Sequence, residues 1–161
     1  MNRRRFLTQT SYLIAAGTLA TVAPYSLAND KQTFEIMRSE KEWRALLTEA
    51  EYAVMREEAT ERPNSSTLLH EKRAGVFNCK GCDLALYDAS TKYESGTGWP
   101  SFYQELPNAV ATKEDRKLFS VRTEAHCRRC GSHLGHIFED GPAPTGLRHC
   151  LNGISLTFQP A

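Results

Sequence analysis

Five cysteines constrain the fold of this 161-residue chain more than any other feature. Four of them form two pairs of equal spacing, Cys79-x-x-Cys82 and Cys127-x-x-Cys130. Each turn can direct two thiolates at one point, and two turns can surround a tetrahedral zinc ion at about 2.3 Å from each sulfur. The 44 residues between the pairs exceed the usual spacing of a zinc ribbon. The sequence therefore predicts one zinc ion that joins distant parts of the fold.

Three other uses of these residues are weighed against this prediction. Each C-x-x-C pair would form its own disulfide in an oxidising compartment. Cys127, Cys130, His133 and His136 recur at every third position and offer a ligand set of their own, but one short segment cannot surround a tetrahedral ion. A redox-active C-x-x-C of the thioredoxin kind needs a strand that runs into a long helix, and neither pair has that setting.

Residues 1–28 differ in composition from the rest of the chain. Three arginines, Arg3 to Arg5, precede Phe6-Leu7 and an uncharged apolar run over 11–23, and the segment has no acidic residue. These features predict a cleavable secretory signal that ends at Ala28, of the twin-arginine type. The run of 13 residues is shorter than the roughly 20 that a transmembrane helix needs, so an uncleaved membrane anchor is the lesser alternative. We expect a periplasmic protein with one domain over 29–161.

The charge balance argues against nucleic acid as a partner. The whole chain carries 20 basic and 19 acidic residues, and loss of the three arginines in 1–28 leaves 17 basic residues and a net charge near −2. Proteins that neutralise phosphates need clustered excess positive charge, which this chain lacks.

Local signals predict two short helices followed by a mainly β region. Ser39 precedes Glu42 by three residues, and Thr48 precedes Glu51 by three, so two capping boxes indicate helices over 40–47 and 49–59. From Pro63 onward, short runs broken by glycine and proline favour strands, among them 75–77, 117–122 and 154–158.

Cys150 has no partner once the other four cysteines are assigned to metal. An unpaired cysteine in an exported protein is a candidate reactive thiol, although a buried inert cysteine is the alternative. Strand alternation places Arg148, Cys150 and Asn152 on one face, continuing through Ile154, Leu156 and Phe158. Arg148 would favour the thiolate, and the amide of Asn152 can orient a bound group.

Three segments resemble the B-type methionine sulfoxide reductases: Gly98–Phe102, Gly135–Pro142 and Arg148–Asn152, interleaved with both C-x-x-C pairs. The resemblance spans roughly residues 43–158. It implies a fold of two antiparallel sheets with short N-terminal helices. It also implies one structural zinc ion held by Cys79, Cys82, Cys127 and Cys130.

The resemblance further implies that Cys150 attacks the sulfur of the R epimer of methionine sulfoxide and is left as a sulfenic acid. The substrate would be methionine sulfoxide in oxidised proteins or peptides. The sulfoxide oxygen then needs a proton donor, and His133 and His136 suit that task, with Asp140 available to orient or charge them. Structural histidines are the alternative. Trp99 would meet the substrate methyl group, with Phe138 a weaker candidate.

The chain departs from the resemblance at three positions. Many B-type enzymes carry a resolving cysteine where this chain has Thr97, so an external thiol, either a thioredoxin-like protein or a small thiol, is expected to reduce the sulfenic acid. His149 stands where an aromatic residue is common, and Gly153 where serine is frequent. These two changes predict altered loop detail with the activity retained.

Two functions of other classes compete with the reductase. A zinc-dependent binding module of related fold explains the paired cysteines but leaves Cys150, Arg148 and the histidines without a role. A thiol–disulfide oxidoreductase would use the paired cysteines themselves, and bound zinc would exclude it.

Overall fold

The computed structural model describes residues 33–116 and 121–161. The expected signal over 1–28 and most of the expected strand over 117–122 lie outside the described residues. Within those two described ranges, no helix is long and apolar enough to cross a membrane.

The two predicted helices are present, and both capping boxes are confirmed. α1 (Glu40–Leu46) begins after Ser39, whose backbone N–H donates to the Glu42 carboxylate at 2.7 Å. α2 (Glu49–Glu57) begins after Thr48, which makes the same reciprocal contacts with Glu51. The helices end one and two residues earlier than predicted. They bury the apolar side chains Trp43, Val54 and Met55 against the sheets.

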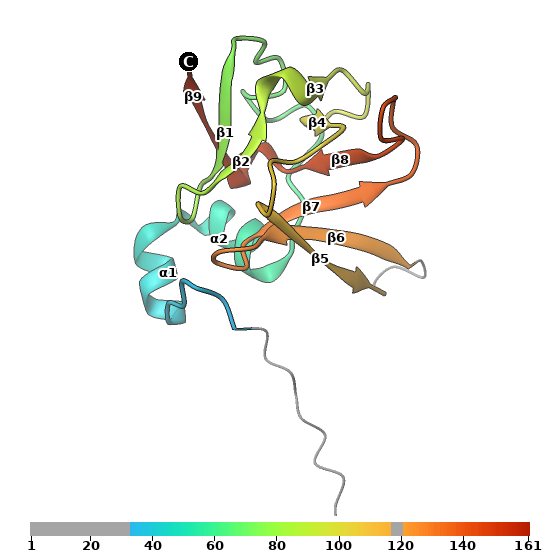
Figure 1. The fold of residues 1–161 in the computed structure, drawn as a ribbon. Coiled ribbons are helices and arrows are strands. Elements are labelled where there is room, and N and C mark those ends of the chain that lie inside the picture. Colours follow the sequence, from blue (N-terminus) through green and yellow to red (C-terminus); the bar gives the residue numbers. More distant parts are fainter. Residues whose placement is uncertain (1–32, 117–120) are drawn as a thin grey trace, which may run out of the picture. The chain divides into compact units, whose positions relative to one another are not determined.

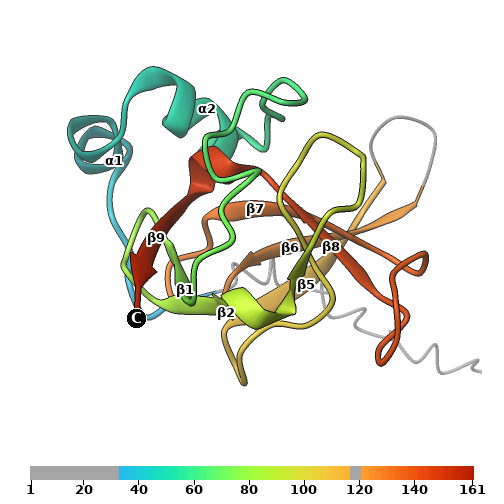
Figure 2. The ribbon, with the colours of Figure 1, turned by 90° about the horizontal axis from the view of Figure 1, so that it is seen from above.

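The strands of the described chain form two antiparallel sheets, as Figures 1 and 2 show from two directions. The smaller sheet has the order β2 (Ala85–Asp88), β1 (Gly75–Cys79) and β9 (Leu156–Pro160). The larger sheet has the order β3 (Lys92–Tyr93), β4 (Ser101–Phe102), β8 (Arg148–Leu151), β7 (His133–Phe138), β6 (Arg122–Cys127) and β5 (Val110–Asp115). The mainly β fold with short N-terminal helices is therefore confirmed.

The continuous strand expected from Arg148 to Phe158 is wrong. The chain leaves the larger sheet after Leu151, makes a 3-10 turn η2 (Gly153–Ser155) and enters the smaller sheet as β9. The carboxylate of Glu61 accepts hydrogen bonds from the backbone amides of Gly153 and Ile154 and so satisfies the turn. Only Arg148 and Cys150 keep the shared face that alternation predicted.

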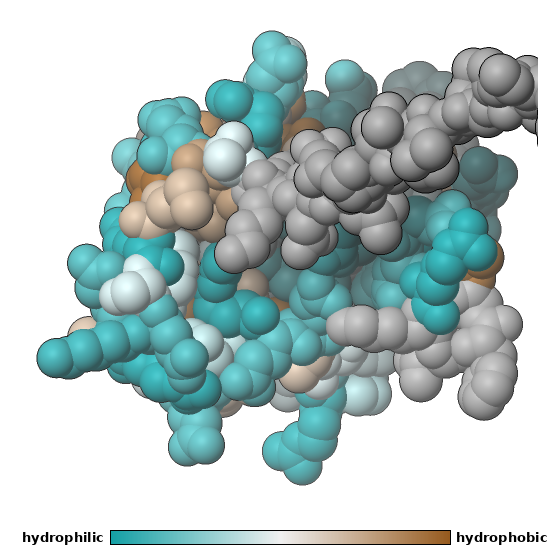
Figure 3. Space-filling model, turned by 90° about the horizontal axis from the view of Figure 1, so that it is seen from below, coloured by the Kyte–Doolittle hydropathy of each residue, from teal (hydrophilic) through white to brown (hydrophobic). Residues whose placement is uncertain are grey.

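The hydrophobic core lies between the two sheets. Phe77 of β1 packs edge-on against Phe102 of β4 at a ring separation of 5.0 Å, and Tyr87 of β2 packs against the same ring at 4.5 Å. Leu134 and Leu151, from β7 and β8, complete the contact and are fully buried. On the face seen in Figure 3, hydrophilic residues cover most of the coloured surface, in keeping with this interior placement of the apolar side chains.

Candidate functional site

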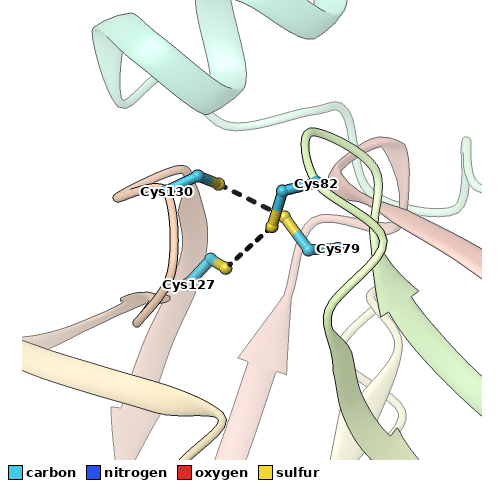
Figure 4. Close-up of side chains that lie close together, drawn as sticks. All are labelled: Cys79, Cys82, Cys127 and Cys130. Carbon is cyan, nitrogen blue, oxygen red and sulfur yellow. Dashed lines mark hydrogen bonds between the residues drawn. The ribbon is translucent and has the colours of Figure 1, made fainter. Parts of the chain in front are cut away.

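The two C-x-x-C turns bring four sulfur atoms together, as the close-up in Figure 4 shows. Cys79 ends β1 and Cys82 lies in the turn after it, while Cys127 ends β6 and Cys130 lies in the turn that leads to β7. The sulfurs of Cys79 and Cys130 are 3.7 Å apart, and those of Cys82 and Cys127 are 3.5 Å apart. A tetrahedral site with metal–sulfur bonds of 2.3 Å has edges of about 3.8 Å, so the cluster fits a metal ion of zinc's size and geometry.

The rival uses of these cysteines do not match this arrangement. All five cysteines are free thiols, and the closest sulfurs lie across the two turns, not within one C-x-x-C pair. A ligand set of Cys127, Cys130, His133 and His136 is also contradicted, because both imidazoles bind carboxylates elsewhere. Neither turn leads from a strand into a long helix, as a thioredoxin-type site requires.

A second group of chemically active side chains lies on one face of the larger sheet. The β7–β8 pairing sets His136 directly opposite Cys150, and Phe138 opposite Arg148. On the other side of β8, Ser101 of β4 is the partner of Cys150. Directly paired residues of antiparallel strands point to the same face, so the thiol lies in a row between an imidazole and a hydroxyl.

A β-bulge adds His133 to this face. Regular alternation would put His133 and His136 on opposite faces, but the β6–β7 register shifts so that His126 pairs with His133 and Leu134 is the extra residue. The two imidazole rings then lie 5.4 Å apart. Gly135 beside the bulge is required by packing, because a Cβ atom there would overlap the carbonyl oxygen of Cys150.

A cavity of about 170 Å³ opens over this face. Among the expected site residues it is lined by Trp99, His136, Phe138, Cys150 and Asn152, whereas His133, Asp140 and Arg148 do not line it. A larger hollow of about 800 Å³ between α2 and β9 contains neither a cysteine nor a histidine. The smaller cavity is therefore the candidate site, because it alone of these two combines a thiol with a proton-carrying group.

The surroundings of Cys150 have opposing effects on the pKa of its thiol. Burial raises the pKa of its thiol, while a contact with Thr97 at 3.8 Å and the nearby guanidinium of Arg148 act to lower it. Arg148 lies over the ring of Phe138 at 4.4 Å and binds Asp140 through two hydrogen bonds of 2.8 and 2.9 Å. Asp140 thereby holds the guanidinium in place at the edge of the site.

Asp140 was expected to orient the histidines, but two other carboxylates do so. His133 Nδ1 donates to Glu124 at 2.9 Å with both groups buried, and His136 Nε2 donates to Asp115 at 2.9 Å. Asp140 contacts neither ring in this structure and pairs with Arg148 instead. Burial lowers the pKa of the His136 imidazole, and the hydrogen bond with Asp115 offsets part of that effect.

Glu61, which no sequence pattern indicated, forms hydrogen bonds with two residues of the site, Trp99 and Asn152. Its carbonyl accepts a hydrogen bond from the Trp99 indole at 3.1 Å, and its backbone N–H donates to the side-chain oxygen of Asn152 at 3.0 Å. Asn152 in turn donates through its amide nitrogen to the carbonyl of Leu134 at 3.1 Å. The amide of Asn152 is thus committed to the backbone, and its structural effect is to hold the end of β8.

Two further lining residues were also missed. Thr60 follows α2, and Arg122 begins β6, two strands away from Cys150 in the larger sheet. Arg122 binds Asp115 at 2.6 Å, so it shares the carboxylate that orients His136. Neither residue belongs to a recognisable motif, and only the strand order brings Arg122 to the cavity.

Fold and site together define a class of two-sheet β proteins that combine a four-cysteine cluster able to hold a metal ion with a separate cavity where a thiol faces an imidazole. The chain belongs to the SelR domain family, whose domain matches residues 47–160.

Similar proteins carry one shared name, peptide methionine sulfoxide reductase MsrB. The relative from Methanosarcina barkeri is 51% identical over 125 residues, which cover 77% of this chain and 88% of that protein. The relative from Leifsonia xyli is 50% identical over 132 residues, covering 81% and 95%. The relative from Alteromonas mediterranea is 47% identical over 134 residues, covering 83% and 94%.

The carboxylate assignment for His136 predicts a titration result. Because burial disfavours its charged form, His136 should bind a proton only below the usual imidazole range, and Asp115→Asn should lower its pKa further by removing the offsetting negative charge. NMR titration of the His136 ring measures both values. Asp140→Asn is the matched control and should leave the His136 titration unchanged. A larger shift from Asp140→Asn than from Asp115→Asn would contradict the assignment.

Proposed function

We propose that this protein reduces the R epimer of methionine sulfoxide in oxidised proteins and peptides, with Cys150 as nucleophile. The observation that carries the proposal is the β7–β8 register, which sets the thiol of Cys150 opposite the imidazole of His136 inside a cavity that Trp99 also lines. The shared name of the similar proteins supports methionine sulfoxide as the substrate.

The chemical step requires a nucleophile and a proton source. The Cys150 sulfur attacks the sulfoxide sulfur as the sulfoxide oxygen is protonated, and the S–O bond then breaks as the oxygen gains a second proton and leaves as water. A water molecule attacks the Cys150 sulfur of the resulting S–S-linked sulfonium, methionine leaves with both electrons of the S–S bond, and Cys150 becomes a sulfenic acid. His136 lines the cavity opposite Cys150, so its second nitrogen takes the thiol proton of Cys150 and passes it to the sulfoxide oxygen, while Asp115 holds its other nitrogen. This relay starts from the neutral imidazole that burial favours. His133, held by Glu124 behind it, positions the His136 ring.

The aromatic lining binds the substrate side chain. The indole of Trp99 is fixed by Glu61, so its face is held ready for the methyl group on a sulfur that gains positive charge. Phe138 provides a second apolar wall, and its ring is held by Arg148 from above. Asn152 fixes the turn at the end of β8, and Asp140 fixes Arg148, so both act by positioning.

The catalytic cycle is completed by an external thiol reductant. The chain has five cysteines, and the four besides Cys150 lie in the metal cluster, so no second thiol remains to form an internal disulfide. Two external thiols reduce the sulfenic acid to the Cys150 thiol, giving one external disulfide and one water molecule. A thioredoxin-like protein or a small thiol fits this role.

Turnover of the two resolved sulfoxide epimers, with dithiothreitol as electron donor, tests this function. The wild-type protein should consume the R epimer alone. Cys150→Ser should lose at least about a thousandfold in activity, since it removes the nucleophile itself, while bound metal and circular dichroism stay unchanged. Equal activity in Cys150→Ser would show that the nucleophile is another group. A wild-type protein that is metal-loaded yet inactive on both epimers would favour the zinc-dependent binding module.

We also propose that the four-cysteine cluster holds one structural zinc ion. The donor set of four thiols, the distances near those of a tetrahedron and the absence of these cysteines from the cavity lining all fit a structural site. When bound, zinc supplies crosslinking between the two sheets and takes no part in the reaction.

The zinc proposal predicts a metal content near one ion per chain by elemental analysis. Cys82→Ser should lose zinc and lower the melting temperature by roughly 10 °C or more, because metal binding energy contributes directly to folding. Cys150→Ser is the matched control, which removes a thiol outside the cluster and should keep both the ion and the melting temperature. Zinc retained at wild-type affinity in Cys82→Ser would contradict the assignment.

We further propose that residues 1–28 direct twin-arginine export to the periplasm, since a route for folded proteins allows zinc to be bound in the reducing cytoplasm first. Cell fractionation should then recover a mature chain that begins at Asn29. The double variant Arg3→Lys and Arg4→Lys should leave uncleaved precursor in the cytoplasm, whereas Arg5→Lys, outside the pair, should be exported normally. Membrane-bound precursor in the wild type would indicate an anchor instead.

A further inference from the structure

Thr97 contacts the sulfur of Cys150 directly, at 3.8 Å between Thr97 Oγ1 and Cys150 Sγ. Behind this contact lies a series of hydroxyl groups. Thr97 Oγ1 is 2.8 Å from Ser95 Oγ, which is 2.7 Å from Ser101 Oγ. Ser101 donates to the carbonyl of Trp99 at 3.1 Å and is fully buried. The sulfur atom of Cys150 is therefore one end of a hydrogen-bonded chain that ends at a carbonyl.

The direction of this chain follows from counting protons. Each hydroxyl has one proton, and the carbonyl of Trp99 can only accept, so Ser101 donates to it and must accept from Ser95. Ser95 then accepts from Thr97, and Thr97 accepts from the Cys150 S–H group. While Cys150 is a neutral thiol, every donor in the chain points away from the sulfur.

Ionisation of Cys150 removes the proton at the start of the chain. Thr97 must then turn its hydroxyl toward the sulfur, because a thiolate only accepts hydrogen bonds. Ser95 donates to Thr97 in its place when Ser101 turns its own proton from the Trp99 carbonyl to Ser95, so that the direction of the whole chain reverses. Ser95 also accepts from the backbone N–H of Thr97 at 3.4 Å, which keeps the loop closed in either state. A hydrogen bond donated to an ionised sulfur is stronger than one to a neutral group.

We infer that Thr97 is a further catalytic residue of the proposed reductase, which donates a hydrogen bond to the Cys150 thiolate and is oriented for this by Ser95 and Ser101. The inference rests on the proposed function of Cys150. It gives a role to Thr97, which stands where many B-type enzymes carry a resolving cysteine. Because burial works against the charged sulfur, a hydroxyl donor within reach stabilises the nucleophilic form where it is most needed.

Other charged and titratable groups face Cys150 and must be held constant in a test. Arg148 lies on the same strand and is bound to Asp140, while Tyr93 approaches from β3. His136 and Arg122 reach the cavity from β7 and β6. All five remain unchanged when only the hydroxyl of Thr97 is removed, so the difference between two Thr97 variants isolates that hydroxyl.

The experiment is the pH dependence of Cys150 alkylation by iodoacetamide, measured in the metal-loaded protein by mass spectrometry of the Cys150 peptide. Thr97→Val keeps the shape of the side chain without its hydroxyl and should move the alkylation midpoint up by about one pH unit, a tenfold loss of thiolate at neutral pH. Thr97→Ser keeps the hydroxyl and should leave the midpoint in place. Thr112→Val, a matched change at an exposed position on β5, should also have no effect. If Thr97→Val loses its fold, Thr97→Ala replaces it.

Identical alkylation midpoints for Thr97→Val and Thr97→Ser would overturn the inference. Wild-type turnover of the R-sulfoxide tests the proposed function separately, since alkylation needs no sulfoxide. Turnover with coincident midpoints would refute the role of Thr97 alone, and shifted midpoints without turnover would refute the reductase and leave the thiolate contact standing. Thr97→Val should also lose about tenfold in turnover at neutral pH, and the loss should shrink as pH rises.

Discussion

Contact between two cysteine turns is the constraint on which the arrangement of the two sheets depends. The turn after β1 belongs to the smaller sheet, and the turn between β6 and β7 belongs to the larger one. Their four sulfurs lie within 4.8 Å of one another. The second turn leads directly into β7, whose first residue is His133. Contact between the two turns at this point holds β7 against the core, and β7 positions the imidazoles of His133 and His136. The hydrophobic contact of Phe77 with Phe102 supports the same packing from inside.

The site is a charged and polar row laid across neighbouring strands of one sheet face. Ser101, Cys150 and His136 occupy adjacent strands by direct pairing, and Glu124 follows on β6 as the partner of His136. Such a row is costly to bury, and each member is accordingly paired. Burial acts to raise the pKa of Glu124, but hydrogen bonds with His133 and Lys113 outweigh it and keep the carboxylate charged. For Cys150 and His136 burial outweighs the hydrogen bonds, so the charged forms of both groups stay disfavoured.

Agreement between sequence and structure is best where the signal is local. The capping boxes at Ser39 and Thr48 define both helix starts, because a reciprocal cap involves residues only three positions apart. The cysteine spacing likewise indicates a joint cluster. Prediction failed at two long-range contacts that no local spacing marks. The expected strand over 148–158 is interrupted by a turn whose amides donate to Glu61, and the acid beside His136 is Asp115, where Asp140 was expected.

The amino-acid sequence by itself determined the mainly β class with two helices, the pairing of four cysteines, the separate status of Cys150 and the family resemblance. These depend on spacing, composition and local hydrogen bonding, which a linear chain displays directly. Only the tertiary structure decided that His133 shares a face with His136, that Arg122 and Thr60 line the cavity, and that Thr97 touches the sulfur of Cys150. The physical reason is that strand order, a one-residue bulge and the turn at Gly153 set these contacts, and each arises from pairing between residues remote in the chain.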